Sequence, residues 1–512
     1  MDSKKFLSLQ NGSDIRGIAT EGIAGEAVNL TPQITETIAL AFVSWLSEKT
    51  GKPANQLSVA VGRDSRISGP ALMSAFIEGL VASGVKAIDC GIASTPAMYM
   101  GTVFNDTLFD GAVMLTASHL PFNRNGLKFF TQNGGLDKPD ITRILETASV
   151  VASPTGTRGN IESFDLISRY SEFLIEKIRK DVNHPAQYNT PLAGFRIVVD
   201  TGNGAGGFFA KKVLKPLGAD TTGSQFLDPD GMFPNHIPNP EDETAMEFIQ
   251  KAVLANKADI GIIFDTDVDR AAAVDHLGNN INRNNLIALI GAITLEEHPG
   301  TAIVTDSITS DGLAEFIEND LKGKHHRFKR GYKNVINEAL RLNAEGQDCW
   351  LAIETSGHAA LKENYFLDDG AYLITKILIK AARLRLEGGK TLLDLTSKLR
   401  VPAESKEFRL KILVPDFKSY GNQVITDLGE YVKTIPGWQI VPNNYEGIRV
   451  SCDPCVGYGW FLLRLSLHDP VIPLNIESEK TGGIVEIASR INAFLERYND
   501  SELDKTSLKK GI

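Results

Sequence analysis

One structural plan, an apolar strand followed by a Gly-rich or polar turn and a helix-patterned stretch, occurs three times along this chain of 512 residues. The three copies cover residues 57–84, 195–218 and 301–321. Short apolar strands that alternate with amphipathic helices are typical of βαβ units and mostly parallel sheets. A prior of roughly 150 residues per domain gives three or four domains for this length. We therefore expect consecutive α/β domains rather than one large core.

The last part of the chain has a different pattern. Closely spaced strand-like segments follow residue 403, among them "EGIRVSCD" (446–453) and "GWFLLRLSL" (459–467). A helix then follows, marked by the helical spacing of Ile484, Ile487, Ile491 and Phe494. This order predicts a small α+β domain at the C-terminal end. Linkers are expected near residues 155–165, 283 and 403.

Composition and charge exclude several classes of protein. A net charge of −10 argues against broad binding to nucleic acid or to anionic membranes. The longest apolar run, Leu286–Leu295, is half of the roughly 20 residues that span a bilayer. The N-terminal sequence "MDSKKFLSLQNGSD" lacks the apolar stretch of a secretory signal. We expect a cytoplasmic protein, or one of the plastid stroma if the chain is a trimmed precursor.

The cysteines do not indicate a disulfide scaffold, because only four occur in the whole chain. Cys452 and Cys455 form a C-x-x-C pair between two strand-like segments, whereas Cys90 and Cys349 are far away in sequence. A zinc site would need two more ligands, and a redox motif is expected at the start of a helix. We interpret the pair as the tip of a hairpin.

The stretch "DIGIIFDTDVDRAAAVD" (259–275) carries the most informative pattern. A buried strand ends in Asp265, Asp267 and Asp269, and alternate residues of an extended chain share one side. Converging carboxylates repel one another, and a hard divalent cation removes that repulsion. An EF-hand loop is excluded, since Arg270 and His276 stand where that loop needs Gly and Glu. A solvated acidic turn is the alternative, but the apolar flanks favour a buried metal site.

The stretch "TASHLPFNRNGLKFF" (116–130) places Ser118 and His119 on a polar turn between two predicted strands, 111–115 and 127–130. Lys128 follows on the second strand. A hydroxyl between an imidazole and an ammonium suits a nucleophile or a serine that carries phosphate. The alternative is that both side chains only satisfy backbone groups of the turn.

The stretch "IETSGHAAL" (353–361) has functional side chains at alternate positions. In an extended chain Glu354, Ser356 and His358 would share one side, where they suit the vicinal hydroxyls of a sugar. The alternative is the capped start of a helix.

The stretch "FLLRLSLHDP" (461–470) alternates leucines with polar residues. One face would offer Arg464, Ser466 and His468 as a phosphate clamp, because a guanidinium matches two phosphate oxygens. A half-exposed strand would show the same alternation.

The stretch "DTGNGAGG" (200–207) satisfies the G-x-G-x-x-G dinucleotide fingerprint with Gly202, Gly204 and Gly207. The acidic partner is expected at the end of the next strand. Asp220 comes before that strand and Asp228 after it, so neither is well placed. A tight turn that packs a strand against a helix explains the glycines equally well.

Together these motifs resemble the α-D-phosphohexomutase superfamily, which includes phosphoglucomutase, phosphomannomutase and phosphoglucosamine mutase. The resemblance covers essentially the whole chain. "SDIRG" (13–17), "VGRDSR" (61–66) and "STPAM" (94–98) are similar to turns of the family's first domain. "TASHLPFNRNGLK" is similar to its phosphoserine loop, "DTDVDR" to its metal loop, "ETSGH" to its sugar loop and "RLSLHDP" to its phosphate loop.

The resemblance implies three α/β domains with mixed, mostly parallel sheets and a C-terminal α+β domain, arranged around one cleft. The implied boundaries are 1–163 with the phosphoserine loop, 164–283 with the metal loop, 284–403 with the sugar loop and 404–512 with the phosphate loop. It also implies Mg²⁺, an activating hexose 1,6-bisphosphate, and a resting enzyme that carries phosphate on Ser118. The expected partners are sugar phosphates, with a monomer or homodimer and no nucleic acid or membrane.

The resemblance further implies a role for each site residue. Ser118 would carry phosphate and complete the metal site with Asp265, Asp267 and Asp269. Lys128, preferred over His119, would handle protons, and Arg16 and Arg270 would stabilise the oxygens in transfer. The implied substrate-binding residues are Glu354, Ser356, His358, Lys333, Arg464, Ser466 and His468.

The sequence departs from the family pattern where substrate would bind. Leu120 stands where Asn is common, Thr266 and Val268 replace glycines of the metal loop, and Tyr332 stands where many members have His. Leu467 and His468 replace Asn and Thr in the phosphate loop.

From the resemblance we predict interconversion of hexose 1-phosphate and hexose 6-phosphate, with glucose or mannose as the sugar. The alternatives are a phosphoglucosamine mutase, a non-catalytic sugar-phosphate-binding homologue, and an NAD-dependent oxidoreductase built on Gly202–Gly207.

Overall fold

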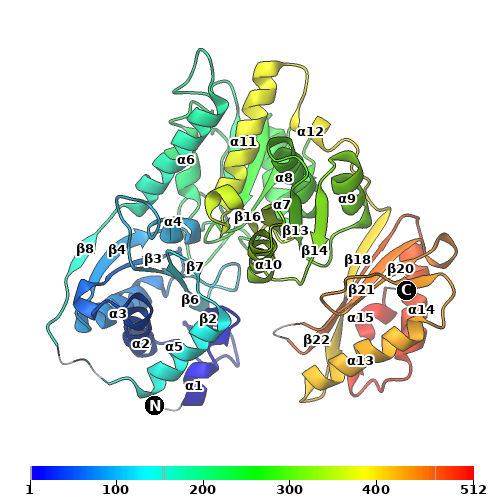
Figure 1. The fold of residues 1–512 in the computed structure, drawn as a ribbon, viewed down its shortest axis with the longest axis horizontal. Helices are drawn as coiled ribbons and strands as arrows, with labels where there is room; N and C mark the ends of the chain where they lie inside the picture. Colours follow the sequence, from blue (N-terminus) through cyan, green and yellow to red (C-terminus); the bar gives the residue numbers. More distant parts are fainter. Residues whose placement is uncertain (1–2, 153, 155, 467–468, 512) are drawn as a thin grey trace. The chain divides into compact units, whose positions relative to one another are not determined.

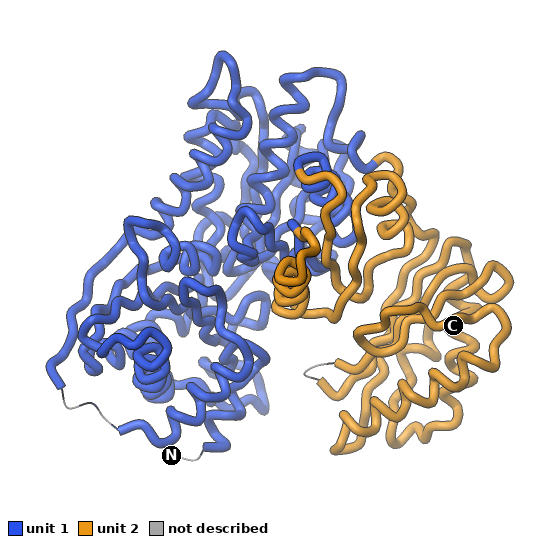
Figure 2. Tube along the Cα trace, viewed as in Figure 1, with its two compact units in different colours: residues 1–297, 350–396 blue, residues 298–349, 397–512 orange. Residues whose placement is uncertain are grey.

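The computed structural model describes residues 3–152, 154, 156–466 and 469–511, and the chain divides into two compact units (Figure 2). Unit 1 comprises residues 1–297 and 350–396, and unit 2 comprises residues 298–349 and 397–512. Each unit is therefore built from two separate stretches of the chain. No helix in the described part of the chain is long and apolar enough to cross a membrane.

A mixed sheet flanked by helices opens unit 1 (Figure 1). Within the described residues it has eight strands in the order β1-β2-β6-β5-β3-β4-β8, with β7 beside β6. Its strands are β1 (Gln10–Asn11), β2 (Asp14–Ile18), β3 (Ser58–Arg63), β4 (Lys86–Ile92), β5 (Gly111–Leu115), β6 (Arg124–Thr131), β7 (Gly134–Gly135) and β8 (Ile161–Ser163). Its helices are α1 (Ser3–Leu7), α2 (Pro32–Thr50), α3 (Gly69–Ala82), α4 (Thr95–Met100), α5 (Lys138–Val150) and α6 (Leu166–Val182).

Pairing in this sheet is parallel at the centre and antiparallel on one side. Strand β3 runs parallel to β4 and β5, whereas β6 is antiparallel to both β2 and β5. Every residue of β5 is buried, as expected for an apolar run in a central strand. Antiparallel strands thus contribute more than the expectation of mostly parallel sheets suggested. A core of α2, α3 and the sheet includes Phe42, Phe76 and Phe129, whose rings lie against one another.

Part of the predicted linker near residues 155–165 has regular structure. Residues 161–163 form β8, which pairs in parallel with β4 at the edge of the sheet. All three side chains of β8 are exposed, so the strand is held by backbone hydrogen bonds and leaves no hydrophobic pattern in the sequence.

A second sheet in unit 1 has the order β12-β11-β10-β9, among the residues described. Strand β10 is parallel to β9 and forms an antiparallel hairpin with β11. The elements are β9 (Ile197–Asp200), η2 (Phe209–Leu214, a π-helix), α7 (Glu243–Asn256), β10 (Ile260–Phe264), β11 (Ala271–Asp275), β12 (Asn280–Ile281) and α8 (Arg283–Glu297). The predicted strand–turn–helix plan at 195–218 is present, with a π-helical second half.

The second chain stretch of unit 1 adds an antiparallel ladder and a long helix. Its elements are β15 (Cys349–Ile353), β16 (Ala359–Leu361), η4 (Lys362–Asn364), β17 (Leu367–Asp368), α11 (Gly370–Glu387) and α12 (Leu392–Leu395). Strand β16 pairs with both β15 and β17. Helix α11 begins at a cap in which Asp369 accepts a hydrogen bond from the backbone N–H of Tyr372.

Unit 2 begins with a parallel pair and continues into an antiparallel sheet. The parallel strands are β13 (Ala302–Thr305) and β14 (Lys324–Arg327). The connection between them contains α9 (Asp311–Glu315) and η3 (Phe316–Asp320), and α10 (Tyr332–Ala344) follows β14. In the described residues, the later sheet has six strands in the order β19-β20-β21-β22-β18-β23. They are β18 (Glu404–Ile412), β19 (Trp438–Ile440), β20 (Ile448–Cys452), β21 (Gly459–Leu463), β22 (Val471–Ser478) and β23 (Leu503–Asp504), with helices α13 (Phe417–Val432), η5 (Pro454–Val456), α14 (Gly483–Leu495) and α15 (Thr506–Lys509).

This later sheet confirms the predicted C-terminal pattern. Ile484, Ile487, Ile491 and Phe494 are all buried on α14, the predicted helix. Cys452 ends β20 and Cys455 lies in η5, so the C-x-x-C pair stands at the tip of the β20–β21 hairpin. Helix α13 was not predicted, although its buried residues Val424, Leu428 and Val432 have helical spacing.

Candidate active site

The three acidic residues of the metal loop lie in a tight turn between the antiparallel strands β10 and β11. Asp265 and Asp267 are 0% exposed and Asp269 is 2% exposed. The chain is not extended here, because Val268 has a φ of +69° and the backbone N–H of Asp265 bonds back to the carbonyl of Arg270. The predicted convergence of the carboxylates is present, but the extended alternation from which it was inferred is wrong.

The backbone of this turn is held by N–H groups from three other segments. The carbonyl of Thr266 accepts from Ala205, that of Asp267 from Thr95 at the start of α4, and that of Val268 from Gly370 at the start of α11. The corresponding nitrogen–oxygen distances are 2.8, 2.9 and 3.1 Å. Backbone N–H groups thus satisfy three carbonyls of the turn, and the carboxylates of the turn are left for other partners.

The three carboxylates fit a divalent cation. One oxygen from each of Asp265, Asp267 and Asp269 lies within 4.8 Å of the others. The Oδ1 atoms of Asp267 and Asp269 are buried and have no hydrogen-bond partner in the described part of the chain. Buried carboxylate oxygens without a donor are costly unless a cation satisfies them, and oxygen ligands are those that hard cations prefer. The set therefore has the chemistry of a metal site.

Lys128 supplies a positive charge to the same carboxylates. Its Nζ is 2.9 Å from Asp267 Oδ2 and also contacts Asp269 Oδ2. Burial disfavours the charged ammonium, but the two carboxylates outweigh it and hold the pKa of Lys128 well above its ordinary value. Burial likewise opposes ionisation of Asp267 and Asp269, yet Lys128 brings the pKa of each below its ordinary value.

Asp265 behaves differently from its two neighbours. Burial first, and then the charges of Asp269 and Asp267, raise the pKa of Asp265 well above the ordinary value. Its Oδ2 accepts a hydrogen bond from Ser118 Oγ at 2.9 Å and lies 3.2 Å from Arg270 Nε. Asp265 therefore connects the acidic turn to the serine.

Ser118 occupies a strained backbone position. It has a φ of +50°, a left-handed conformation that residues other than glycine rarely adopt. Its Oγ lies 2.9 Å from Asp265, 3.1 Å from Arg270 NH2 and 3.4 Å from His119 Nδ1. Residues held in such conformations cluster at active sites and ligand clamps. The alternative interpretation, that the Ser118 hydroxyl only bonds to backbone groups of its own turn, does not explain its contacts with residues about 150 positions away.

Histidine and arginine residues surround the Ser118 hydroxyl. Arg270 NH2 is 2.6 Å from His119 Nδ1, and burial together with Arg270 and Arg16 lowers the pKa of His119 to about 3. The imidazole is therefore neutral at neutral pH. Arg16 donates to the carbonyl of Thr116 at 3.3 Å and pairs with Asp14 at 2.9 Å, which places it beside the start of the same loop.

The predicted sugar-binding residues lie in a turn that contacts the metal loop. Glu354, Ser356 and His358 lie between strands β15 and β16, so the alternative of a helix start is wrong. Ser356 Oγ is 2.9 Å from His358 Nδ1 and 3.4 Å from Glu354 Oε2. A backbone bridge joins His358 to Arg270. Gly357 has a φ of +94°, and a Cβ there would lie 2.7 Å from the carbonyl oxygen of Ala271, so this position requires glycine.

Several residues of this centre were not identified from the sequence. Thr95 Oγ1 donates to Asp267 Oδ2 at 2.5 Å, and Asn239 Oδ1 accepts from Arg270 NH1 at 3.1 Å. Asp368 Oδ2 is 3.4 Å from His358 Nε2, so Asp368, His358 and Asp269 form a second group of potential ligands. Thr95 lies in the "STPAM" stretch, which was noted only as a turn. Asp368 had no signal, because it becomes close to His358 only when β17 pairs with β16.

The glycine-rich turn of residues 202–207 packs against protein rather than leaving room for a dinucleotide. A Cβ at Gly204 would lie 2.7 Å from the carbonyl oxygen of Thr266, and one at Gly207 would lie 2.1 Å from that of Leu227. The N–H groups of Asn203, Gly204 and Ala205, which would face a pyrophosphate, donate to protein carbonyls instead. Gly204 thus allows this turn to approach Thr266 of the metal loop, and Gly207 allows it to approach Leu227.

The predicted phosphate clamp lies in unit 2 and differs from the expected strand face. Strand β21 ends at Leu463, so Arg464 and Ser466 lie in the connection to β22. Arg464 is only 7% exposed and its NH1 is 3.7 Å from Glu446 Oε1. Its Nε is buried and has no hydrogen-bond partner among the residues that the structure describes. Burial lowers the pKa of Arg464, Glu446 opposes this, and Arg330 adds to it. His468 and Leu467 lie outside the described residues.

A cavity of about 490 Å³ adjoins this connection and is lined by Lys329, Arg330, Asn334, Glu446 and Leu465, among others. Lys333, another predicted substrate-binding residue, lies in the first turn of α10. Cationic side chains around a cavity beside Arg464 are what an anionic ligand needs. Sequence reasoning identified Arg464 and Lys333. It missed Lys329 and Arg330, which precede Lys333 in the "KRGYKNV" stretch (329–335).

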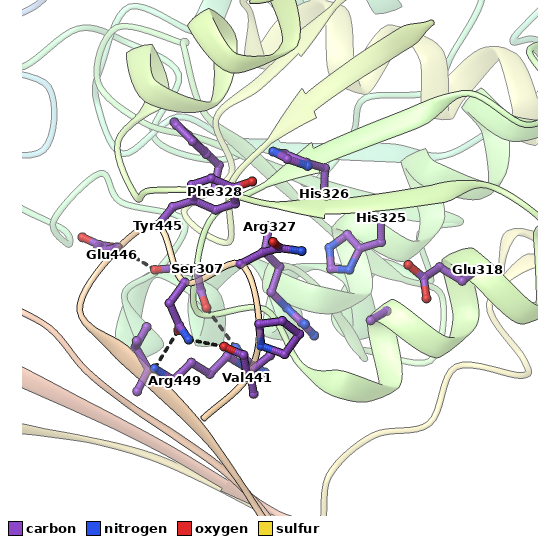
Figure 3. A pocket seen from close by; sticks show the side chains of 15 residues that line it. Ser307, Glu318, His325, His326, Arg327, Phe328, Val441, Tyr445, Glu446 and Arg449 are labelled. Atoms are coloured by element: carbon purple, nitrogen blue, oxygen red, sulfur yellow. Dashed lines mark hydrogen bonds between the residues drawn. The ribbon is translucent and has the colours of Figure 1, made fainter. Parts of the chain in front are cut away.

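Figure 3 shows a second cavity of unit 2, of about 190 Å³, which also has Glu446 in its wall. Its two arginines bond within the protein: Arg327 and Arg449 both donate to Asp311 Oδ1, at 2.9 and 2.8 Å. Ser307 Oγ donates to Glu446 Oε2 at 2.6 Å. The hydroxyl of Ser307 therefore holds the side chain of Glu446 in place.

Comparison with known proteins identifies the family. Models described as phosphoglucomutase/phosphomannomutase, alpha/beta/alpha domains I, II and III match residues 8–150, 169–278 and 282–400. A phosphoglucomutase of Neisseria meningitidis serogroup A is 29% identical over 487 residues, which is 94% of this chain and 95% of that protein. A phosphoglucomutase/phosphomannomutase of Thermococcus kodakarensis is 30% identical over 470 residues, or 91% and 93% of the two chains.

A solved structure supports the same assignment. A phosphoglucomutase/phosphomannomutase family protein of Burkholderia thailandensis superposes with a TM-score of 0.77 at 27% identity, covering 97% of this chain and 98% of that one. The prediction of three consecutive α/β domains followed by a further C-terminal domain is confirmed. The matched segments cover well over half of the residues, in the predicted order. The chain belongs to the phosphoglucomutase/phosphomannomutase family.

Proposed function

We propose that this protein interconverts hexose 1-phosphate and hexose 6-phosphate, with glucose or mannose as the sugar, through a phosphoserine at Ser118 and a hexose 1,6-bisphosphate intermediate. The observation that carries the proposal is the position of Ser118 Oγ, 2.9 Å from a buried acidic triad and 3.1 Å from a buried guanidinium. The names of the relatives, phosphoglucomutase and phosphomannomutase, support the same activity.

The carboxylates of Asp265, Asp267 and Asp269, with an oxygen on Ser118, would hold Mg²⁺. When bound, the ion would offset the charge of the phosphoserine and polarise its phosphorus. The two unpartnered Oδ1 atoms of Asp267 and Asp269 support this assignment. Arg270 would remain on the serine oxygen and stabilise negative charge as it develops there.

The transfer requires an exchange of one bond for another. The free hydroxyl oxygen of the substrate attacks phosphorus, the bond from phosphorus to Ser118 Oγ breaks, and the bisphosphate forms. The bisphosphate then turns over, and Ser118 Oγ attacks its other phosphate to give the isomeric product. The protein does little covalent work beyond the serine, so orientation and charge stabilisation dominate the rate.

A proton must leave the attacking hydroxyl in each transfer. Of the two groups predicted to handle protons, Lys128 is held in its charged form by Asp267 and Asp269, whereas His119 is neutral because its pKa is lowered to about 3. A neutral imidazole can accept a proton and an ammonium cannot. However, Nδ1 of His119 already accepts a hydrogen bond from Arg270 NH2 at 2.6 Å, so we keep both residues as candidate proton handlers, with Lys128 preferred as in the sequence-based prediction.

Recognition of the sugar is assigned to the turn 354–358 and recognition of the distal phosphate to the residues of unit 2. Glu354, Ser356 and His358 offer an acceptor, a hydroxyl and an imidazole to vicinal hydroxyls. Arg464, Ser466 and Lys333 would bind phosphate, because a buried guanidinium with an unpartnered Nε gains charge-assisted hydrogen bonds from an anion. We further expect a cytoplasmic monomer or homodimer, which analytical ultracentrifugation and fractionation would test.

Two other functions rest on weaker support. A phosphoglucosamine mutase would use the same centre, and only the sugar turn would distinguish it. A non-catalytic sugar-phosphate sensor would not need the strained Ser118. The oxidoreductase alternative loses its binding site, since the glycine turn is filled by Thr266 and Leu227.

The test is a coupled assay of glucose 1-phosphate isomerisation with Mg²⁺ and catalytic glucose 1,6-bisphosphate, with mannose and glucosamine 1-phosphates in parallel. Turnover should be lost in Ser118→Ala and retained in the control Ser507→Ala, which changes an exposed serine. Residual activity of Ser118→Ala above a few per cent would overturn the phosphoserine assignment. Wild-type protein that folds but turns over none of the three sugars would favour the sensor.

A further inference from the structure

Arg66 lies directly beneath the loop that carries Ser118, and its side chain is 0% exposed. Its guanidinium donates four hydrogen bonds to backbone carbonyls of that loop. NH1 donates to Pro121 and Arg124 at 2.8 and 3.0 Å, and NH2 donates to Leu120 at 2.7 Å and to Ser118 itself. One buried cation therefore holds the carbonyls of a seven-residue loop, including that of the reacting residue.

The surroundings of Arg66 fix its guanidinium in place. Its Nε is 3.2 Å from Asp64 Oδ2, while its own backbone N–H donates to Asp64 Oδ1 at 2.9 Å. The ring of Phe233 covers the guanidinium, with 5.2 Å between the guanidinium carbon and the ring centroid. At Gly231 a Cβ would lie 2.6 Å from the Cα of Arg66, so the 231–233 segment approaches closely enough to exclude water.

The contact with the Ser118 carbonyl is connected to the direction of the Ser118 side chain. In the left-handed conformation at φ +50°, the carbonyl of Ser118 points at Arg66 while its Oγ points at Asp265. This conformation costs a serine on the order of 1–3 kcal/mol, and it persists only where the surroundings determine it. The backbone N–H of Ser118 is also restrained, because it donates to Thr116 Oγ1 at 2.9 Å.

We infer that Arg66 is a positioning residue for the reaction, whose guanidinium holds Ser118 in the left-handed conformation that aims Oγ at Asp265 and Arg270. The inference rests on the proposed function, because it assigns Arg66 a role through the nucleophile. It goes beyond a stabilising ion pair, since Asp64 already neutralises the charge and the four carbonyl contacts are additional. Lysine could carry the same charge but could not place donors on four carbonyls at once.

A positioning role has a particular kinetic signature. Misplacing a reacting atom by about 1 Å lowers a rate by roughly 10²-fold, whereas binding of the sugar and the distal phosphate does not involve this loop. Arg66→Lys should therefore lower kcat by about 10–100-fold and leave KM within about threefold. The amides of residues 117–124 should exchange with deuterium faster, while those of β5 and β6 keep their protection.

The matched control is Arg63→Lys. Arg63 ends β3, directly before the turn that carries Arg66, is partly exposed, and donates to the carbonyl of Asp64 at 3.1 Å rather than to the serine loop. Its kcat, KM and loop exchange should stay at wild-type values. A second variant, Arg66→Ala, leaves a space where guanidinium ion can enter, so millimolar guanidinium should restore part of its kcat while equimolar ammonium should not.

The outcomes separate positioning from structure. If Arg66→Lys loses activity only in proportion to the fraction that fails to fold, or keeps both its kcat and its loop protection, the inference is wrong. If Arg66→Ala does not fold, Arg66→Lys and its exchange pattern still decide. If the wild type shows no mutase activity at all, the proposed function fails, and unchanged exchange of residues 117–124 in Arg66→Lys would separately overturn the role of Arg66.

Discussion

The serine centre of unit 1 and the arginine clamp of unit 2 are both buried and both rich in charge, yet their charges are satisfied in different ways. In unit 1 each cation has a carboxylate at short range: Lys128 contacts Asp267 and Asp269, and Arg270 contacts Asp265. In unit 2, Arg464 NH1 lies 3.7 Å from Glu446 Oε1, and Arg464 Nε has no hydrogen-bond partner among the described residues.

The difference matches the two tasks. A centre that stabilises a transition state must have its dipoles and charges fixed before substrate arrives, because reorganisation would cost part of the rate. A clamp that releases and rebinds a phosphate must not satisfy its guanidinium within the protein. We therefore expect charge changes in unit 1 to affect stability and kcat, and charge changes in unit 2 to affect KM.

The largest effect is expected for Lys128→Met. Removing the ammonium leaves two buried carboxylates without a partner, which costs about 3–5 kcal/mol of unfolding free energy. Urea denaturation without added metal measures the loss, and millimolar Mg²⁺ should restore part of it. The control is Lys52→Met, whose ammonium is half exposed and 2.6 Å from Asp110, so that its loss should cost at most about 1 kcal/mol. Equal losses for the two variants would contradict the comparison.

Next in size is the kinetic effect of Asp267→Asn. The substitution removes one negative ligand and should lower kcat by roughly 10²–10³-fold, the size typical of losing one group that stabilises charge in a transition state. The concentration of Mg²⁺ that gives half-maximal activity should rise. Titration of activity with Mg²⁺ measures both, with the exposed pair residue Asp228→Asn as control. An unchanged magnesium requirement would remove Asp267 from the metal site.

Arg464→Gln should have a smaller effect and a different signature. Hydrogen bonds to a charged group contribute about 1.5–3 kcal/mol, so KM should rise about 10–100-fold while kcat falls much less. Steady-state kinetics at several substrate concentrations separate the two parameters. Arg409→Gln, which changes an exposed arginine paired with Glu407, should leave both near wild type. A loss in kcat alone would place Arg464 with the serine centre instead.

The smallest effect concerns pH and Glu477 of unit 2. Burial raises the pKa of Glu477 to about 7, although Arg449 and the indole N–H of Trp460 oppose the shift. Between pH 4.5 and 7 the folded protein keeps a proton that the unfolded chain releases, so this residue should make stability fall, by at most about 1.4 kcal/mol per pH unit, as pH rises through that window. Glu477→Gln should flatten the curve of melting temperature against pH. If exposed Glu486→Gln flattens it as much, Glu477 is not the source.

Sequence patterns were sufficient for elements whose signal is local. The apolar run 111–115 predicted β5, and the spacing of Ile484, Ile487, Ile491 and Phe494 predicted α14. The acidic motif predicted a cluster of carboxylates even though the backbone there is a tight turn. The residues that carry chemistry were found because their types are unusual for a buried strand end.

What the sequence could not supply depends on contacts between distant segments. Thr95 contacts Asp267 across 172 positions, and Asp368 reaches His358 only through strand pairing. The four carbonyls on Arg66 are main-chain groups, which have no sequence signature at all. The protonation states of Lys128 and His119 could not be predicted either, because they depend on which charges the fold places beside each group.

The division of each unit into two chain stretches sets an order for synthesis on the ribosome. Glu354, Ser356 and His358 belong to the second stretch of unit 1, so its centre cannot be completed until about 396 residues have been made.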